Sequence, residues 1–145
     1  MYLSGIDNTF VSDERKRGFL STLKENGIEF DEENIINAKF SELIAERMVK
    51  ERYKDADALV CANDGMAIGA LRALKSLNID VPDKVAVAGG DNIFISRYFV
   101  PSLTTFDNMQ NELGVTAAKT LIKMIEGKKA KSVVLNSDIV IREST

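Results

Sequence analysis

The sequence contains no histidine and a single cysteine, Cys61, among its 145 residues. Histidine is the side chain most often used as a general base near neutral pH, so its absence removes the catalytic arrangements built on it. The motifs G-x-G-x-x-G and G-x-x-x-x-G-K-[ST] and the nucleophile elbow are also missing. We therefore expect a protein that is not an enzyme and uses no cofactor and no metal. The alternative is an α/β enzyme with a metal on Asp64 and Asp91, although no further ligand residues cluster with them.

Three further absences restrict where the chain works. One cysteine cannot form a disulfide within the chain, which fits a reducing compartment. No apolar run approaches the roughly 20 residues of a membrane span, and the first residues lack the basic and apolar regions of a signal peptide. The net charge of −3 provides no basic excess for binding nucleic acid. We expect a cytoplasmic protein whose residues in this chain contact neither a membrane nor DNA.

The most informative feature is a pair of polar corners that directly follow apolar runs. In the segment V-C-A-N-D-G-M-A-I-G-A-L (60–71), a short apolar run ends at Asn63-Asp64 and a helical pattern begins at once. A second corner, V-A-V-A-G-G-D-N (85–92), follows further along the chain. We expect the two apolar runs to be neighbouring strands. In open α/β sheets ligands bind at this end of the strands, so the pattern indicates a small-molecule site.

The rest of the chain alternates between apolar runs of strand length and helical patterns. Helices are predicted from an N-cap at Ser12 to Asn26, over 41–53, from Asp64 to Leu77 and over 108–126; strands are predicted at 2–3, 34–37, 58–62, 85–88, 102–106, 132–135 and 139–142. In the helix over 41–53, Leu43, Ile44 and Met48 are expected to face inward. This alternation predicts a doubly wound, mostly parallel α/β sheet with right-handed crossovers.

The predicted helix over 108–126 differs from the others. Its apolar stripe is made of Leu113, Ala117, Ala118, Leu121, Ile122 and Ile125. The small Ala117-Ala118 pair indicates close contact with another surface, which we expect to lie outside this chain. The chain also opens in what reads as the middle of a strand, Tyr2-Leu3, and this is typical of a piece of a longer protein.

Many short motifs occur in one characteristic order along the chain. They are Leu3-Ser4-Gly5, Arg15-Lys16-Arg17-Gly18-Phe19, Cys61-Ala62-Asn63-Asp64-Gly65-Met66-Ala67 with Gly69-Ala70-Leu71, Val81-Pro82, Gly90-Asp91-Asn92, Arg97-Tyr98, Pro101 with Leu103-Thr104-Thr105, and Arg142-Glu143-Ser144-Thr145. Each motif alone is weak, but together they cover nearly the whole chain. In this order they resemble the LacI/GalR family of bacterial transcription regulators.

The resemblance implies a periplasmic-binding-protein-like fold of two subdomains, with a small-molecule effector in the cleft between them. Residues 1–145 would then be the C-terminal subdomain plus the crossover helix that packs on the N-terminal subdomain. The N-terminal subdomain and the helix-turn-helix domain would lie outside this chain. The resemblance also implies a homodimer that reaches operator DNA only through that missing domain. A free-standing solute-binding protein is a further alternative.

The resemblance also implies ligand-binding roles for several residues. Arg15 would offer a planar fork of donors to sugar hydroxyls or to a carboxylate. Asn63 would hydrogen-bond to the ligand, with Asp64 as the cap of the following helix; Asn63 as the cap is the alternative. Asp91 would accept hydrogen bonds from vicinal hydroxyls or from a purine N–H, unless it only shapes its turn. A sugar or sugar derivative is the expected effector, and a nucleobase is the second choice.

Two further positions carry weaker expectations. Phe40 stands where the family often has an aromatic that stacks on the ligand, although it is equally consistent with a core residue or a helix staple. Thr9 matches a minor polar ligand position. Gly90 departs from the family, which usually has an aromatic residue there, so the floor of the pocket is expected to be wider or the turn looser. Gln110 stands where some relatives have an apolar contact, and that role is not carried over to it.

Overall fold

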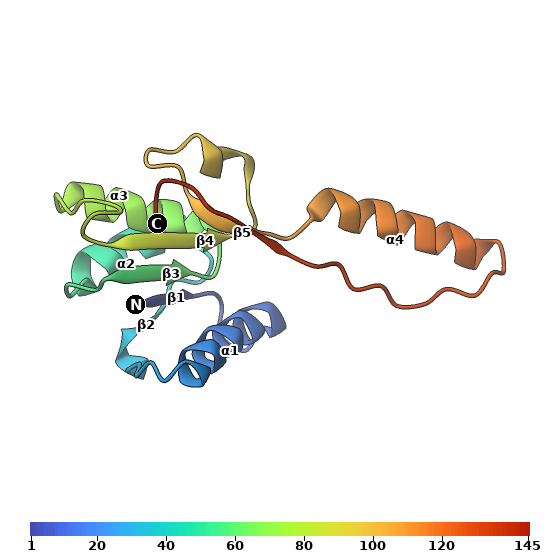
Figure 1. The fold of residues 1–145 in the computed structure, drawn as a ribbon, viewed down its shortest axis with the longest axis horizontal. Helices are drawn as coiled ribbons and strands as arrows, with labels where there is room; N and C mark the ends of the chain where they lie inside the picture. Colours follow the sequence, from blue (N-terminus) through green and yellow to red (C-terminus); the bar gives the residue numbers. More distant parts are fainter.

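A computed structural model describes all residues, 1–145, and its centre is a six-stranded sheet (Figure 1). The strands are β1 (Tyr2–Ser4), β2 (Ile35–Asn37), β3 (Ala58–Cys61), β4 (Ala86–Gly90), β5 (Thr104–Asp107) and β6 (Asp138–Val140). Their spatial order is β2-β1-β3-β4-β5-β6. All neighbouring pairs are parallel except β5 and β6, which are antiparallel. The predicted doubly wound, mostly parallel sheet is confirmed.

Four α-helices and two 3₁₀ turns connect the strands. They are α1 (Phe10–Glu25), η1 (Glu32–Asn34), α2 (Glu42–Arg52), α3 (Asp64–Ser76), η2 (Phe94–Arg97) and α4 (Gln110–Ile125). The crossover from β1 to β2 runs in the opposite direction to the crossovers from β2 to β3 and from β3 to β4. Right-handed crossovers therefore place α1 on one face of the sheet and the pair α2–α3 on the other. None of the helices combines the length and the apolar character of a membrane span.

The core lies between the sheet and the pair α2–α3. Leu59 and Val87 of the central strands are fully buried, and Met66 and Leu74 meet them from α3. Burying a side chain of this size stabilises the fold by roughly 1.5–3 kcal/mol. The two helices approach closely at Gly69, where a Cβ atom would collide with the carbonyl oxygen of Glu42. The small residues of the G-M-A-I-G-A segment thus serve helix packing.

The other face of the sheet is only partly covered. Phe19 of α1 stacks on Tyr2 of β1, with ring centroids 4.7 Å apart. Tyr2 is in register with Val60, and Val60 with Ala88, so these residues share the face that carries α1. Yet Val60 and Ala88 are only half-buried. Parallel sheets are normally covered on both faces, so this surface is open to a further element.

Helix α4 stands away from the sheet (Figure 1). It leaves the sheet after β5, and the chain returns through β6. None of its residues is buried, and Leu121, Ile122 and Ile125 are 58%, 54% and 76% exposed. The predicted apolar stripe therefore has no partner within this chain.

Three details of the sequence prediction are wrong. Helix α1 begins at Phe10, after the N-cap residue Thr9, and Ser12 is a buried residue inside it; the exposed, apolar Phe10-Val11 pair had hidden this start. Leu43 is 72% exposed, since Ala45 and Val49 are the residues of α2 that face the core. No strand forms at 132–135, because no neighbouring strand is there to pair with it and Val134 is 88% exposed.

Candidate functional site

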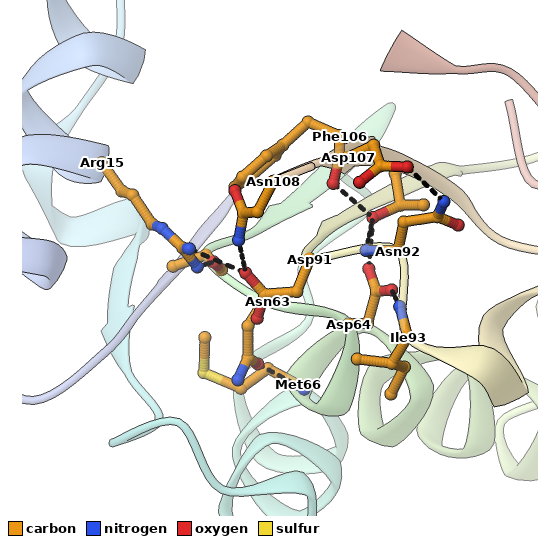
Figure 2. Close-up of polar contacts among 12 residues, drawn as sticks. Arg15, Asn63, Asp64, Met66, Asp91, Asn92, Ile93, Phe106, Asp107 and Asn108 are labelled. Carbon is orange, nitrogen blue, oxygen red and sulfur yellow. Dashed lines mark hydrogen bonds and ion pairs between the residues drawn. The ribbon is translucent and has the colours of Figure 1, made fainter. Parts of the chain in front are cut away.

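The two polar corners of the sequence lie side by side, as predicted. Strands β3 and β4 are parallel neighbours, with Leu59 opposite Val87. Their carboxyl ends therefore meet at one edge of the sheet, which is also the edge where α4 departs (Figure 1). Arg15 reaches the same edge from α1 (Figure 2).

Asp91 is the central carboxylate of this edge. Its backbone has a left-handed φ of 105°, which costs of order 1–3 kcal/mol outside glycine. Its amide nevertheless continues the sheet by donating to the carbonyl of Phe106 at 2.9 Å. Its Oδ1 accepts hydrogen bonds from Arg15 Nη2 at 2.7 Å and from Asn108 Nδ2 at 2.6 Å (Figure 2). Both of these bonds fall on Oδ1, so Oδ2 is left for another partner.

Arg15 connects three strands. Besides Asp91 after β4, its guanidinium donates to the carbonyl of Ala62 after β3. It also lies over the ring of Phe106 in β5, 4.9 Å from the centroid. The side chains of Arg15 and Asp91 are 21% and 22% exposed, so the ion pair is largely but not fully removed from water. The structure thus brings Arg15 and Asp91, both predicted site residues, into direct contact.

Phe106 also explains how the chain accommodates Gly90. A Cβ atom built on Gly90 would overlap the Phe106 ring. The aromatic ring of the neighbouring strand therefore occupies the space above Gly90. The expectation of a wider pocket floor at Gly90 is therefore wrong, because Phe106 covers Gly90 and supports Arg15.

Asn63, and not Asp64, caps α3, which is the alternative that the sequence left open. Asn63 is the N-cap of α3, and its Oδ1 accepts a hydrogen bond from the amide of Met66 at 2.9 Å. Its Nδ2 has no partner in the protein. Asp64 is fully buried and does not cap the helix. Its Oδ1 accepts from the Thr105 hydroxyl at 2.5 Å and its Oδ2 from the Ile93 amide at 2.9 Å (Figure 2).

Burial raises the pKa of the Asp64 carboxyl above its ordinary value, and the hydrogen bond from Thr105 opposes that shift. The carboxylate joins the start of α3, the corner after β4 and strand β5. It therefore holds the backbone that follows Asp91 and does not face a ligand.

Asn92 carries a second set of hydrogen bonds beside Asp91. Its backbone amide donates to the Thr105 hydroxyl at 3.2 Å, and its Nδ2 donates to Asp107 Oδ2 at 2.9 Å. Its Oδ1 accepts from Arg142 Nη2 at 2.6 Å. The hydrogen bond from Asn92, together with one from the Met109 amide, holds the pKa of Asp107 below its ordinary value.

Phe40 and Thr9 have local partners. The Phe40 ring lies where a Cβ atom of Gly5 would be and packs against the core, which favours its interpretation as a packing residue. The Thr9 hydroxyl donates to the carbonyl of Ile6 at 2.7 Å. Neither side chain has a hydrogen bond or ring contact with Arg15 or Asp91, so the structure does not join them to the pair.

A cavity of about 970 Å³ opens between the Asp91 corner and the start of α4. Its lining residues include Asp91, Asn92, Asp107 and Gln110. Nowhere do three histidine, cysteine, aspartate or glutamate side chains converge in the manner of a metal site. With the charged pair beside it, the cavity can hydrogen-bond a polar molecule through several neighbouring donors and acceptors.

The sequence reasoning missed Phe106 and Asn108 as parts of this edge, and it gave Asn92, which it placed in the second corner, no role of its own. Asn108 follows β5 directly, as Asp91 follows β4, and Asn63 follows β3 with one residue between them. Applying the same strand-end rule to the third strand would have found Asn108. The role of Phe106 could not be found in this way, because it depends on its register opposite Gly90.

The whole chain, residues 1–145, matches the family described as periplasmic binding protein-like domain. The uncharacterized HTH-type transcriptional regulator YvdE of Bacillus subtilis (strain 168) is 33% identical over 137 residues, which are 90% of this chain and 42% of that protein. A solved sugar-binding transcriptional regulator of the LacI family from Escherichia coli, complexed with phosphate, superposes with a TM-score of 0.90 at 32% identity, over 99% of this chain and 53% of that one. The solved complex of the transcriptional regulator CelR with cellobiose superposes with a TM-score of 0.89 at 28% identity, over 99% and 46%. The chain thus spans about half the length of these relatives.

Proposed function

Because this chain belongs to the family of periplasmic binding protein-like domains, in the form found in LacI-family transcriptional regulators, we propose that it is an effector-binding module of such a regulator. The observation that carries this proposal is the Arg15–Asp91 pair at the carboxyl edge of the sheet, 2.7 Å apart and next to the point where α4 leaves. The effector would bind at this edge, with no chemical step.

The free hydrogen-bonding groups of the pair suit a molecule rich in hydroxyls. The guanidinium of Arg15 has five N–H donors, of which its hydrogen bonds to Ala62 and Asp91 use only two. Asp91 Oδ2 is a free acceptor next to them. A hydroxyl both donates and accepts, so neighbouring hydroxyls of one sugar can satisfy both residues at once. Asn63, through its free Nδ2, would add one more donor.

A neutral sugar or sugar derivative is therefore the effector that we favour. Opposite charges that already pair with each other add little attraction for a charged ligand, whereas they polarise hydroxyls strongly. The cellobiose complex of CelR supports a sugar ligand, and the solved relative from Escherichia coli is likewise described as sugar-binding. A nucleobase, which would donate a ring N–H to Asp91, is the second choice.

Binding would regulate DNA through the rest of the longer protein. We infer that an N-terminal subdomain covers the apolar stripe of α4 and closes over the effector, and that a helix-turn-helix domain beyond it binds operator DNA. The unpartnered α4 stripe and the half-length match to HTH-type regulators support this organisation. The effector would favour one arrangement of the two halves by its difference in affinity for them. A regulator of this kind would act in the cytoplasm.

We further propose that the regulator is a homodimer. The segment around η2 exposes a cluster of apolar side chains, in which Phe94, Tyr98 and Val100 are 71%, 61% and 80% exposed. The Phe94 and Tyr98 rings pack on each other with centroids 4.9 Å apart, so they form one patch. An exposed apolar patch of this kind supports a protein–protein contact.

Calorimetric titration of the full-length regulator tests the effector site. The probes are simple sugars, cellobiose, sugar phosphates and purine bases. We expect one of these classes to bind, and Arg15→Ala or Asp91→Ala to weaken that binding about 10- to 100-fold, as the loss of charged hydrogen bonds implies. Arg17→Ala is the matched control, because Arg17 is exposed and pairs only with Glu14. Failure of every probe to bind, or equal affinity in Arg15→Ala and Arg17→Ala, would contradict the proposal.

A further inference from the structure

Asn92 lies where the Asp91 corner meets both connections to α4. Its side chain donates to Asp107 at the end of β5, where the chain leaves for α4. It accepts from Arg142, just after β6, where the chain returns. Asn92 therefore bridges the outgoing and the returning segment. Figure 2 shows its hydrogen bond to Asp107 and its place next to Asp91.

The hydrogen bonds of Asn92 use each polar group that it has, except its own carbonyl. The backbone amide is taken by Thr105, Nδ2 by Asp107 and Oδ1 by Arg142. Its backbone, like that of Asp91, has a positive φ, here 48°. Two consecutive left-handed residues persist only where their surroundings hold them firmly. The three hydrogen bonds of Asn92 supply that support from β5 and from the segment after β6.

Arg142 extends this bridge to the other side of the corner. Its Nη1 donates to the Ser96 hydroxyl at 2.9 Å and to the Leu103 carbonyl at 2.7 Å. Ser96 in turn donates to the Ile93 carbonyl at 2.7 Å. One guanidinium thus holds Asn92 and the η2 turn against the strand that leads to α4. Moving α4 relative to the sheet would therefore displace the groups that hold Asn92, the residue next to Asp91.

The geometry points to Asn92 as a positioning residue that couples the Asp91 corner to the two strands carrying α4. The regulatory meaning of this coupling rests on the proposed function, in which Asp91 binds the effector and α4 carries the second subdomain. The coupling itself is a property of residues 1–145 and can be measured without a ligand. Absence of the coupling would not change the result of the effector titration, and absence of effector binding would not change the coupling measured on residues 1–145.

A reversed pair of side chains provides the test. Asn92→Asp places a carboxylate against the Asp107 carboxylate and breaks that hydrogen bond. Adding Asp107→Asn restores the bond with its direction reversed, because the new amide at position 107 would donate to the new carboxylate at position 92. Arg142 would still donate to that carboxylate, as it does to the amide oxygen of Asn92. Asn111→Asp is the matched control, since Asn111 is an exposed residue in the first turn of α4.

Two measurements on the 145-residue chain test the coupling, one at α4 and one at the Asp91 corner. Spin labels attached at Lys75→Cys in α3 and Lys119→Cys in α4 report the orientation of α4 by double electron–electron resonance. The native cysteine is removed by Cys61→Ser, and the labelled chain is diluted with unlabelled chain. Amide hydrogen exchange of Asp91 and Ile93 reports the corner. We expect Asn92→Asp to lose the narrow distance distribution and the protection of both amides, and the Asn92→Asp/Asp107→Asn chain to regain both.

Several outcomes would overturn the coupling. Distances and exchange in Asn92→Asp that match those of the Asn111→Asp control would do so. A change at α4 without a change at Asp91 and Ile93 would show that the two ends are independent. If Asn92→Asp does not fold, the reversed double variant decides: its recovery of fold, distances and protection supports the coupling, and its failure contradicts it.

Discussion

Replacing Asp64 by asparagine changes one atom of a fully buried side chain whose two oxygens have separate tasks. Oδ1 accepts from the Thr105 hydroxyl at 2.5 Å, and Oδ2 accepts from the Ile93 amide at 2.9 Å. The amide of asparagine keeps one oxygen and turns an NH₂ group toward the other donor. One of the two donors therefore loses its present acceptor; if the NH₂ group faces Thr105, the hydroxyl keeps only the Phe106 carbonyl, at 3.3 Å.

An unsatisfied buried donor costs about 1–3 kcal/mol. Loss of the negative charge from the first turn of α3 removes a further 0.3–1 kcal/mol or so of helix-dipole stabilisation. Relief from burying a charge acts in the opposite direction, so we expect Asp64→Asn to lower the free energy of unfolding by about 1–3 kcal/mol at neutral pH. Asp64→Ala removes the carboxylate that accepts from both donors, and we expect a larger loss, of about 2–6 kcal/mol, by the same rule.

The pH dependence of the stability difference between the wild-type chain and Asp64→Asn is a second, independent test. Burial raises the pKa of Asp64 in the folded state. The stability that its protonation contributes is therefore fully present below its ordinary pKa of about 3.9, and it is lost as the pH rises through the folded value. Asparagine does not titrate, so the stability difference between the wild-type chain and Asp64→Asn should widen as the pH falls from neutral.

Urea unfolding at several pH values from neutral to about 4 measures both the stability difference at neutral pH and its change with pH. Asp83→Asn is the matched control, because Asp83 is exposed and has no side-chain hydrogen bond in the structure. The reasoning is refuted if Asp64→Asn is as stable as Asp83→Asn at neutral pH. A stability difference that narrows on acidification would refute the burial argument alone.

Three other changes test separate features of the fold. Gly69→Ala would place a methyl group against the Glu42 carbonyl, and we expect a loss of about 1–3 kcal/mol in urea unfolding. Gly18→Ala is its control, because the space around Gly18 is open, and an equal loss in both variants would contradict the close helix contact. Asp107 has a lowered pKa, so the stability that it contributes is present above its ordinary pKa and lost as the pH falls through the folded value. We therefore expect the free energy of unfolding of Asp107→Asn to fall less on acidification than that of the wild-type chain. Equal decreases in denaturation experiments at decreasing pH would argue against the Asp107 hydrogen bonds. Ile125→Gln, on a side chain that is 76% exposed, should leave the unfolding free energy unchanged and reduce self-association of the chain in light scattering. Equal association of both chains would show that the α4 stripe is not involved.

Predictions that rest on local pattern agree well with the structure. The two apolar runs before Asn63 and Asp91 are neighbouring parallel strands. The long helix with a stripe that has no partner in the chain is also present. Hydrophobic periodicity determines these features, because a strand or helix must bury its apolar side whatever the rest of the chain does. The strand at 132–135 failed for the complementary reason, since a strand also needs a partner that the pattern cannot supply.

The amino-acid sequence was sufficient to predict the fold class, the order of the elements and the edge of the sheet where polar side chains gather. These follow from the spacing of apolar residues and from the handedness of crossovers, both of which are local properties of an L-amino-acid chain. The folded chain was needed to show that Arg15 meets Asp91, that Asn63 and not Asp64 caps α3, and that Phe106 covers Gly90. The contacts of Arg15 and Phe106 depend on strand register and on which helix reaches the sheet edge, whereas Asn63 is the cap because Thr105 and Ile93 hold the Asp64 carboxylate in the interior. Residues as far apart as Arg15 and Asp91 become neighbours only after the sheet has assembled.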